Sequence, residues 1–240
     1  MDALSSLAII AFAALIHASF QLSVSVLTLL SGHAIGKKTA HNKLIRLTSS
    51  FVIGVGVMTL LIVSFLSYFI GQTFGSGTPL VLWAGACGLV LGLGVAVWTF
   101  YYRRQSGTSL WLPRGLARYL NDRSKATTRS AEAFSLGLTS VITELLFILA
   151  PMLIAALVLV QLDSVWQIVG LVLYSLVSSL SLGIVWMLIG GGHRLSGIQK
   201  WREQNKKFLQ FAAGSGLIVL GFYVYVDQVM TATVLAQAGL

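Results

Sequence analysis

Six long apolar runs constrain this chain more than any other feature of its sequence. Each run is long enough for one α-helix to cross a hydrocarbon core of about 30 Å. Backbone N–H and C=O groups in lipid must be satisfied within their own segment, so the runs predict helices. The runs extend over Leu4–Leu30, Leu47–Ile70, Leu80–Tyr102, Phe134–Gln161, Val165–Ile189 and Phe208–Val226. We therefore expect an all-α integral membrane protein with six transmembrane helices.

The composition agrees with a lipid environment and excludes several functional classes. The chain is 56% hydrophobic and 10% charged, whereas a soluble domain carries about 25% charged residues. Its net charge of +9 does not indicate nucleic-acid binding, because the basic residues lie between the apolar runs. The single cysteine, Cys87, excludes an intramolecular disulfide. No phosphate loop, nucleophile motif or metal-binding histidine pair is present, so we expect no enzyme, cofactor or metal.

The basic residues predict the orientation of the chain in the membrane. They follow the first, third and fifth runs. Lys37, Lys38, Lys43 and Arg46 follow the first run, and Arg194, Lys200, Arg202, Lys206 and Lys207 follow the fifth. The third run is followed by Arg103, Arg104, Arg114, Arg118, Arg123, Lys125 and Arg129. The connectors Gly71–Pro79 and Leu162–Ser164 have none. Positively charged loops stay in the cytoplasm. We expect a multi-pass protein of a prokaryotic plasma or inner membrane with both termini outside the cytoplasm.

Six spans in this order divide into two sets of three with opposite orientation. Any relation between the sets is then an inverted repeat. We expect a first three-helix repeat over residues 1–102, a basic cytoplasmic linker over 103–133 and a second repeat over 134–240. The segment that begins at Phe20 in the first span resembles the one that begins at Phe134 in the fourth. Pro113 suits the start of a short amphipathic helix through Leu120 in the linker. The alternative for this loop is a solvated basic connector that rests near anionic lipid headgroups.

The fourth span carries the strongest likeness to a known family. Its sequence from Ala133 to Pro151, with Phe134, Gly137 and Phe147 at matching places, resembles the fourth span of the LysE-type superfamily of small exporters, which includes the RhtB-like amino-acid exporters. The turn and basic loop after the first span, the stretch Lys200-Trp-Arg and the Gly-rich last span are similar too. The family's first span usually has a Pro-Gly-Pro break, where this chain has His17-Ala-Ser19.

The resemblance implies a small secondary transporter that exports a small solute, an amino acid or an ion. The chain has no ATP-binding element, so an ion gradient or the gradient of the solute itself would drive transport. The alternative is a non-catalytic accessory or assembly subunit that packs against another membrane protein. The expected partners are therefore the lipid bilayer and a small solute or ion. A second copy of the chain and another membrane protein both stay open as partners.

Glu144 is the first candidate site residue because it is the only carboxylate well inside an apolar run. It lies about 15 Å past Phe134 along a helix axis, near the membrane midplane. An ionisable group at that depth is a functional candidate, and a span of low dielectric favours the protonated form of a carboxyl. Thr139, Ser140 and Thr143 lie within about a turn and are expected hydrogen-bonding partners. The alternative role is a protonated glutamic acid that joins two helices by a hydrogen bond.

His17 and a polar stripe in the fifth span complete the predicted proton and substrate pathway. His17 and Gln21 are spaced i, i+4 and so share a helix face. Tyr174, Ser178 and Ser181 follow i, i+4, i+7 and predict one stripe. His17 is either a proton shuttle or a neutral histidine satisfied by a neighbour. The stripe either lines a water-filled path or lets two helices approach closely.

Small residues in the third span predict one close helix contact. Gly88 and Gly92 form a small-xxx-small pair, and Gly85 lies one turn earlier. Such pairs let helix backbones approach in membranes. We expect this face to pack against another helix.

Overall fold

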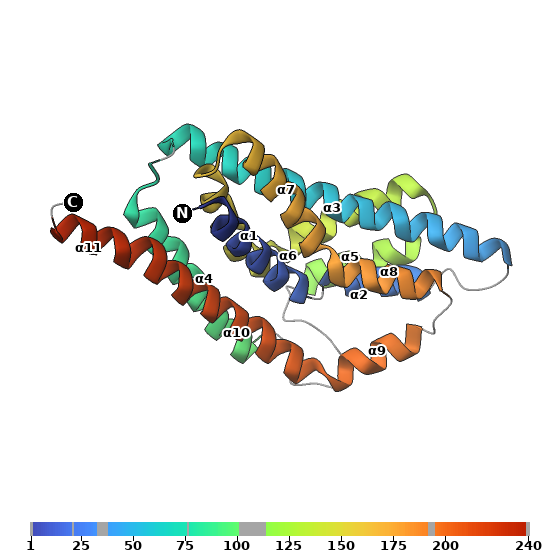
Figure 1. The fold of residues 1–240 in the computed structure, drawn as a ribbon. Coiled ribbons are helices and arrows are strands. Elements are labelled where there is room, and N and C mark those ends of the chain that lie inside the picture. The colour runs from blue at the N-terminus through green and yellow to red at the C-terminus, as the bar shows by residue number, and fades with distance from the viewer. Residues whose placement is uncertain are drawn as a thin grey trace.

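The structure is a computed structural model, and it describes residues 2–20, 22–32, 38–75, 77–100, 114–191 and 195–238 of the 240. Over these residues every regular element is helical, and no strand occurs (Figure 1). The helices are α1 (Ala3–Ser19), α2 (Leu22–Gly32), α3 (Lys38–Phe74), α4 (Leu80–Phe100), α5 (Arg114–Ala126), α6 (Ser130–Val160), α7 (Ser164–Ser178), α8 (Leu180–Gly190), α9 (Leu195–Gln204), α10 (Lys206–Val224), η1 (Tyr225–Met230) and α11 (Thr231–Ala238). The expectation of an all-α membrane protein is confirmed at this level.

Four of the continuous helices described are long and apolar enough to cross a membrane. They are His41–Phe74, Leu80–Phe100, Ser130–Val160 and Lys206–Val234. Two further candidates are bent pairs, in which α1 meets α2 at 46° and α7 meets α8 at 50°. The described chain therefore has four candidate spans, or up to six if each bent pair is one span. The number six stays a prediction.

The first apolar run breaks at Phe20 although no proline stands there. Phe20 is extended (φ −75°, ψ 143°), and its N–H donates to the carbonyl of His17 at 3.0 Å. The Ser19 hydroxyl donates to the carbonyl of Ile16 at 2.6 Å. A serine that bonds the backbone of the preceding turn competes with helix continuation. The expectation of one helix over Leu4–Leu30 is therefore wrong.

The fifth run breaks in a similar way, between α7 and α8. Ser179 adopts φ −87° and ψ 0°, a conformation between helix and turn. Just before it, the Ser178 hydroxyl donates to the carbonyl of Ser175 at 3.2 Å. The expectation of one straight helix over Val165–Ile189 is therefore wrong as well.

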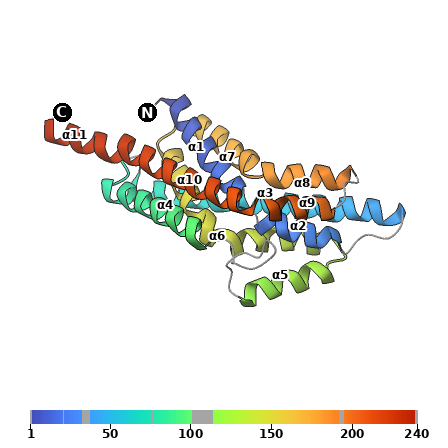
Figure 2. The same cartoon turned by 90° about the horizontal axis from the view of Figure 1, so that it is seen from below.

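The two broken spans lie side by side. α1 packs on α7, and α2 packs on α8. Both chain ends lie at the same end of the molecule, while α5, α9 and the first turns of α3 lie toward the opposite end (Figures 1 and 2). Termini at one end agree with an even number of crossings. Which end faces the cytoplasm stays a prediction.

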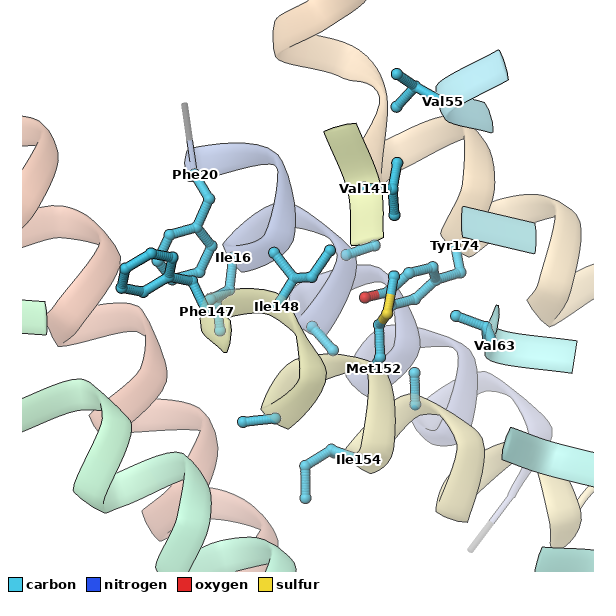
Figure 3. Close-up of a cluster of buried hydrophobic side chains, with 14 of the residues drawn as sticks. Ile16, Phe20, Val55, Val63, Val141, Phe147, Ile148, Met152, Ile154 and Tyr174 are labelled. Carbon is cyan, nitrogen blue, oxygen red and sulfur yellow. The ribbon is translucent and has the colours of Figure 1, made fainter. Parts of the chain in front are cut away.

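α6 is the central helix of the described bundle. It packs against α1, α3, α4 and α7. In its most apolar stretch 72% of the residues are buried, compared with 33% or less in the other three continuous spans. It contributes many of the fully buried side chains, including Ile148, Met152 and Ile154 (Figure 3). The fourth span has no break, whereas the first has one. The predicted inverted repeat pairs these two spans, and that relation stays a prediction.

Glycines set the closest helix contacts, but not the glycines that the sequence suggested. α3 and α6 cross at Gly54 and Gly137, where a Cβ on either residue would collide with the backbone of the other helix. α4 and α10 approach closely at Gly94 and Gly214, where a Cβ would first meet the side chains of Ile218 and Trp98. At Gly88 and its neighbours Gly85 and Gly92, a Cβ would meet nothing within 4 Å. No helix of the described chain packs on this face of α4, so its packing stays a prediction.

Candidate functional site

Glu144 lies buried in the fourth turn of α6, next to the break in the first span. It is 3% exposed, and the hydroxyl of Ser23 in α2 donates to its Oε2 at 2.7 Å. The hydroxyl of Ser140, one turn earlier in α6, lies 3.4 Å from the Ser23 hydroxyl. The burial of Glu144 agrees with its predicted position well inside the fourth apolar run. Ser23, a partner from the first span, was not assigned this role.

The break explains why a carboxyl is tolerated at this depth. α2 begins at Leu22, so Ser23 lies in its first turn. The first N–H groups of a helix have no partner within the helix, and they carry a partial positive charge. An acceptor such as Glu144, placed beside this turn, lies in a favourable field. The Ser23 hydroxyl, which donates to the carboxyl, reduces the cost of its removal from water.

His17 and Tyr174 form a second buried polar group. The Nδ1 atom of His17 and the Tyr174 hydroxyl are hydrogen-bonded at 3.1 Å, and the two ring centroids lie 5.8 Å apart. His17 is 6% and Tyr174 1% exposed. Each residue lies about one turn before the break of its own span. This bond therefore joins α1 to α7 next to both breaks.

Apolar side chains enclose both polar groups. The ring of Phe20, at the first break, stacks on Phe147 of α6 with centroids 5.9 Å apart. Figure 3 shows the Tyr174 ring between Val63, Val141 and Met152, with its hydroxyl turned toward the interior. Low-dielectric surroundings of this kind strengthen the hydrogen bonds that are made.

The other residues predicted for the pathway do not lie together beside Glu144. The Thr143 hydroxyl donates to the carbonyl of Ser140 at 2.8 Å, so it is satisfied within α6. The Thr139 hydroxyl donates to the carbonyl of Ser135, and Thr139 lines a pocket between α5 and α6. Gln21 lies outside the described residues.

The polar stripe predicted in the fifth span does not form as one straight line. Tyr174 and Ser178 are buried at the end of α7. Ser181 belongs to α8, which turns away by 50° after Ser179. Only the first two residues of the stripe therefore share a helix face. The i, i+4, i+7 spacing assumed a continuous helix, and the break removes that assumption.

Arg202 is a second site residue that the sequence did not single out. It lies in α9, is 3% exposed, and its Nη2 donates to the Ser25 hydroxyl of α2 at 2.9 Å. Its position in a basic segment predicted a solvated charge. In the structure two serines of α2 thus bond to two buried charged residues, Ser23 to Glu144 and Ser25 to Arg202. No local pattern in the sequence distinguishes Arg202 from its exposed neighbours.

The charged and polar groups here do not suggest a metal centre. Within the described ranges, no three His, Cys, Asp or Glu side chains cluster closely enough to hold an ion. What the arrangement can do chemically is to bind or release a proton at Glu144 or His17, and to present hydroxyls to a polar solute.

Comparison with known proteins adds no family to this description. No family model, no curated protein and no solved structure matches the chain. The function must therefore be inferred from the helices, the two breaks and the buried polar groups.

Proposed function

We propose that this protein is a small secondary membrane transporter that exports a small solute, an amino acid or an ion, driven by an ion gradient. The observation that carries the proposal is the carboxyl of Glu144, buried in α6 beside the break between α1 and α2. Broken helices near the midplane, with polar side chains at the break, are a recurring way to build substrate and ion sites in transporters. Ionisable residues at that depth most often mark an ion or proton path.

The paired breaks supply a motion that fits this proposal. On one side of the breaks α1 packs on α7, and on the other side α2 packs on α8. We call the second pair the α2–α8 half. Rotation of the α2–α8 half about Phe20 and Ser179 would open the space beside Glu144 on that side of the membrane. The buried state of Glu144, His17 and Tyr174 then corresponds to a closed conformation. The His17–Tyr174 bond holds the opposite half together during this motion.

The proposed setting is a prokaryotic plasma membrane, with both termini outside and the basic segments in the cytoplasm. The one-sided distribution of all 16 basic residues supports it. In this orientation α2, α8 and Arg202 lie in the cytoplasmic half. Opening of the α2–α8 half would then expose Glu144 to the cytoplasm, as an exporter requires for loading.

The test is proton movement in proteoliposomes that contain the purified protein. Amino acids and inorganic cations are added one at a time to vesicles with an imposed pH gradient and an entrapped pH-sensitive dye. We expect at least one solute to produce proton flux in the wild type, and Glu144→Gln to abolish it while the protein still inserts and folds. Glutamine keeps the size and hydrogen-bonding capacity of glutamate but does not ionise.

Asp227→Asn is the matched control, since it makes the same chemical change in η1, near the end of the last span. This variant should retain the flux. A Glu144→Gln variant with normal flux at every pH would reduce Glu144 to a structural hydrogen-bonding group. Absence of flux with every solute would argue against transport as a whole.

The alternative function is an accessory subunit for another membrane protein, and one observation favours it. The glycine face of α4 around Gly88 is open in the described chain, and small-residue faces of this kind pack closely in membranes. An accessory role predicts that Gly88→Leu disrupts co-purification of a membrane partner. Under this alternative, Glu144→Gln has no effect on that association.

A further inference from the structure

A pocket of about 510 Å³ lies between α5 and α6, apart from the buried groups described above. Its wall includes Tyr119, Arg123 and Thr127 from α5 and the following turn, and Glu132, Ser135 and Thr139 from α6. Two small apolar side chains, Ala126 and Ala131, also line it. The lining therefore combines charge, hydroxyl groups and apolar surface.

The position of the pocket along α6 places it across the edge of the hydrocarbon. With Glu144 near the midplane, the core boundary falls near Phe134, about 15 Å away along the helix. Glu132 then lies at headgroup level, and Thr139 lies about 7 Å inside the hydrocarbon. A molecule that fills this pocket must be polar at one end and tolerate an apolar medium at the other.

The charge at the headgroup level is positive. Between Arg114 and Arg129 the chain has five basic residues and one acidic residue, Asp122. The guanidinium of Arg123 lies 5.7 Å from the centroid of the Tyr119 ring, and within the described chain it forms no ion pair. Arg123 is thus a cation on the pocket wall whose hydrogen-bonding capacity is available to a ligand.

Glu132 also lines the pocket, and its carboxylate lies at the start of α6. Its Oε2 accepts hydrogen bonds from the backbone N–H groups of Thr128 at 2.8 Å and of Arg129 at 3.0 Å. The carboxylate therefore caps α6, where it also compensates the partial positive charge of the helix start. Arg123 and the Ser135 hydroxyl remain as donors on the wall, because the Thr127 and Thr139 hydroxyls donate to the backbone carbonyls of Arg123 and Ser135.

We infer that this pocket binds the headgroup of an anionic phospholipid, with Arg123 as the cation that contacts the phosphate. A guanidinium and a serine hydroxyl close to headgroup level suit a phosphate, and basic pockets on the cytoplasmic side of membrane helices bind such headgroups. The apolar surface and the depth of the pocket suit the glycerol and first acyl carbons. This inference is independent of transport and concerns how the linker between the two predicted halves is held at the membrane surface.

The experiment measures stabilisation of the full-length protein in detergent by added lipid. Short-chain phosphatidylglycerol, phosphatidylcholine with the same acyl chains, and inorganic phosphate are each titrated, and the thermal unfolding midpoint is recorded. We expect a saturable rise with phosphatidylglycerol and a much smaller one with phosphatidylcholine. Arg123→Gln should weaken the apparent affinity for phosphatidylglycerol about tenfold, the scale of one charge-assisted contact.

Lys125→Gln is the matched control, because Lys125 is exposed on the same helix and does not line the pocket. It should change the affinity less than about twofold, because Lys125, unlike Arg123, does not contact the pocket. Equal losses in the two variants would mean diffuse attraction to a basic surface, and equal responses to the two lipids would mean no selection for charge. Either result overturns the inference.

Two further arms remove the remaining ambiguities. Saturation by inorganic phosphate over the same concentration range would identify a phosphate site and overturn the assignment to a lipid. If Arg123→Gln does not fold, Ser135→Leu fills the pocket from α6 without a change of charge. That variant should lose the response to phosphatidylglycerol, and a retained response would refute the site.

Discussion

The crossing of α3 and α6 at Gly54 makes the sharpest prediction about stability. A Cβ on Gly54 would fall against the backbone carbonyl oxygen of Phe134, and Gly137 stands in the reciprocal position against Phe51. The obstacle is main chain in both cases, so no side-chain rotation relieves it. Gly54→Ala must therefore push the two helices apart.

The magnitude follows from the packing around this point. Restoring ordinary van der Waals contact requires a separation of about 1 Å, and a gap of that size forfeits about a quarter to a half of the dispersion energy of each affected contact. Phe51 and Val55 on α3 and Leu136 on α6 are buried beside the crossing. Overpacking of cores costs about 1–3 kcal/mol, and rigid backbone on both sides puts Gly54→Ala near the upper value, about 3 kcal/mol.

The control lies two residues further along the same helix. A Cβ on Gly56 would meet nothing within 4 Å. Gly56→Ala should be neutral or stabilise the helix by up to about 1 kcal/mol, the difference in helix propensity between the two residues. The measurement is equilibrium unfolding in mixed micelles with a rising fraction of SDS, followed by tryptophan fluorescence. If Gly54→Ala unfolds at the same SDS fraction as Gly56→Ala, α3 and α6 do not cross as described.

Three other predictions concern orientation and the buried polar groups. Tags at both termini should be labelled by impermeant reagents in intact cells, whereas a cysteine in place of Arg118 should not; cytoplasmic labelling of either terminus would reverse the proposed orientation. Tyr174→Phe removes only the hydroxyl bonded to His17 and should cost about 1 kcal/mol in the SDS assay, with no further loss when His17 is also changed to Phe. Ser23→Ala leaves the buried Glu144 without one donor and should cost about 1–3 kcal/mol, whereas Ser23→Thr should restore most of it; equal stability of the Ala and Thr variants would show that this bond is not made.

The sequence by itself determined the features that depend on local composition. Helices occupy the six apolar runs in order, two of the runs as bent pairs, because the apolar length that crosses a bilayer is a property of each segment alone. The short helix predicted after Pro113 is also present, as α5. The depth of Glu144 in its run likewise indicated a buried carboxyl, because a residue near the middle of an apolar span cannot reach water.

The tertiary structure alone decided where the spans break and which faces meet. No proline or glycine stands at Phe20 or Ser179, so the sequence does not mark the two breaks. The Ser19 and Ser178 hydroxyls bond to the carbonyls of the preceding turn, and this weakens the helix only where neighbouring helices support the bend. Gly54 and Gly88 look equivalent in the sequence, yet one meets the backbone of α6 and the other faces outward. A helix that is apolar on every side carries no periodic signal for its inner face. For the same reason the contacts of Ser23 with Glu144 and of Ser25 with Arg202 emerge only when α2, α6 and α9 are assembled.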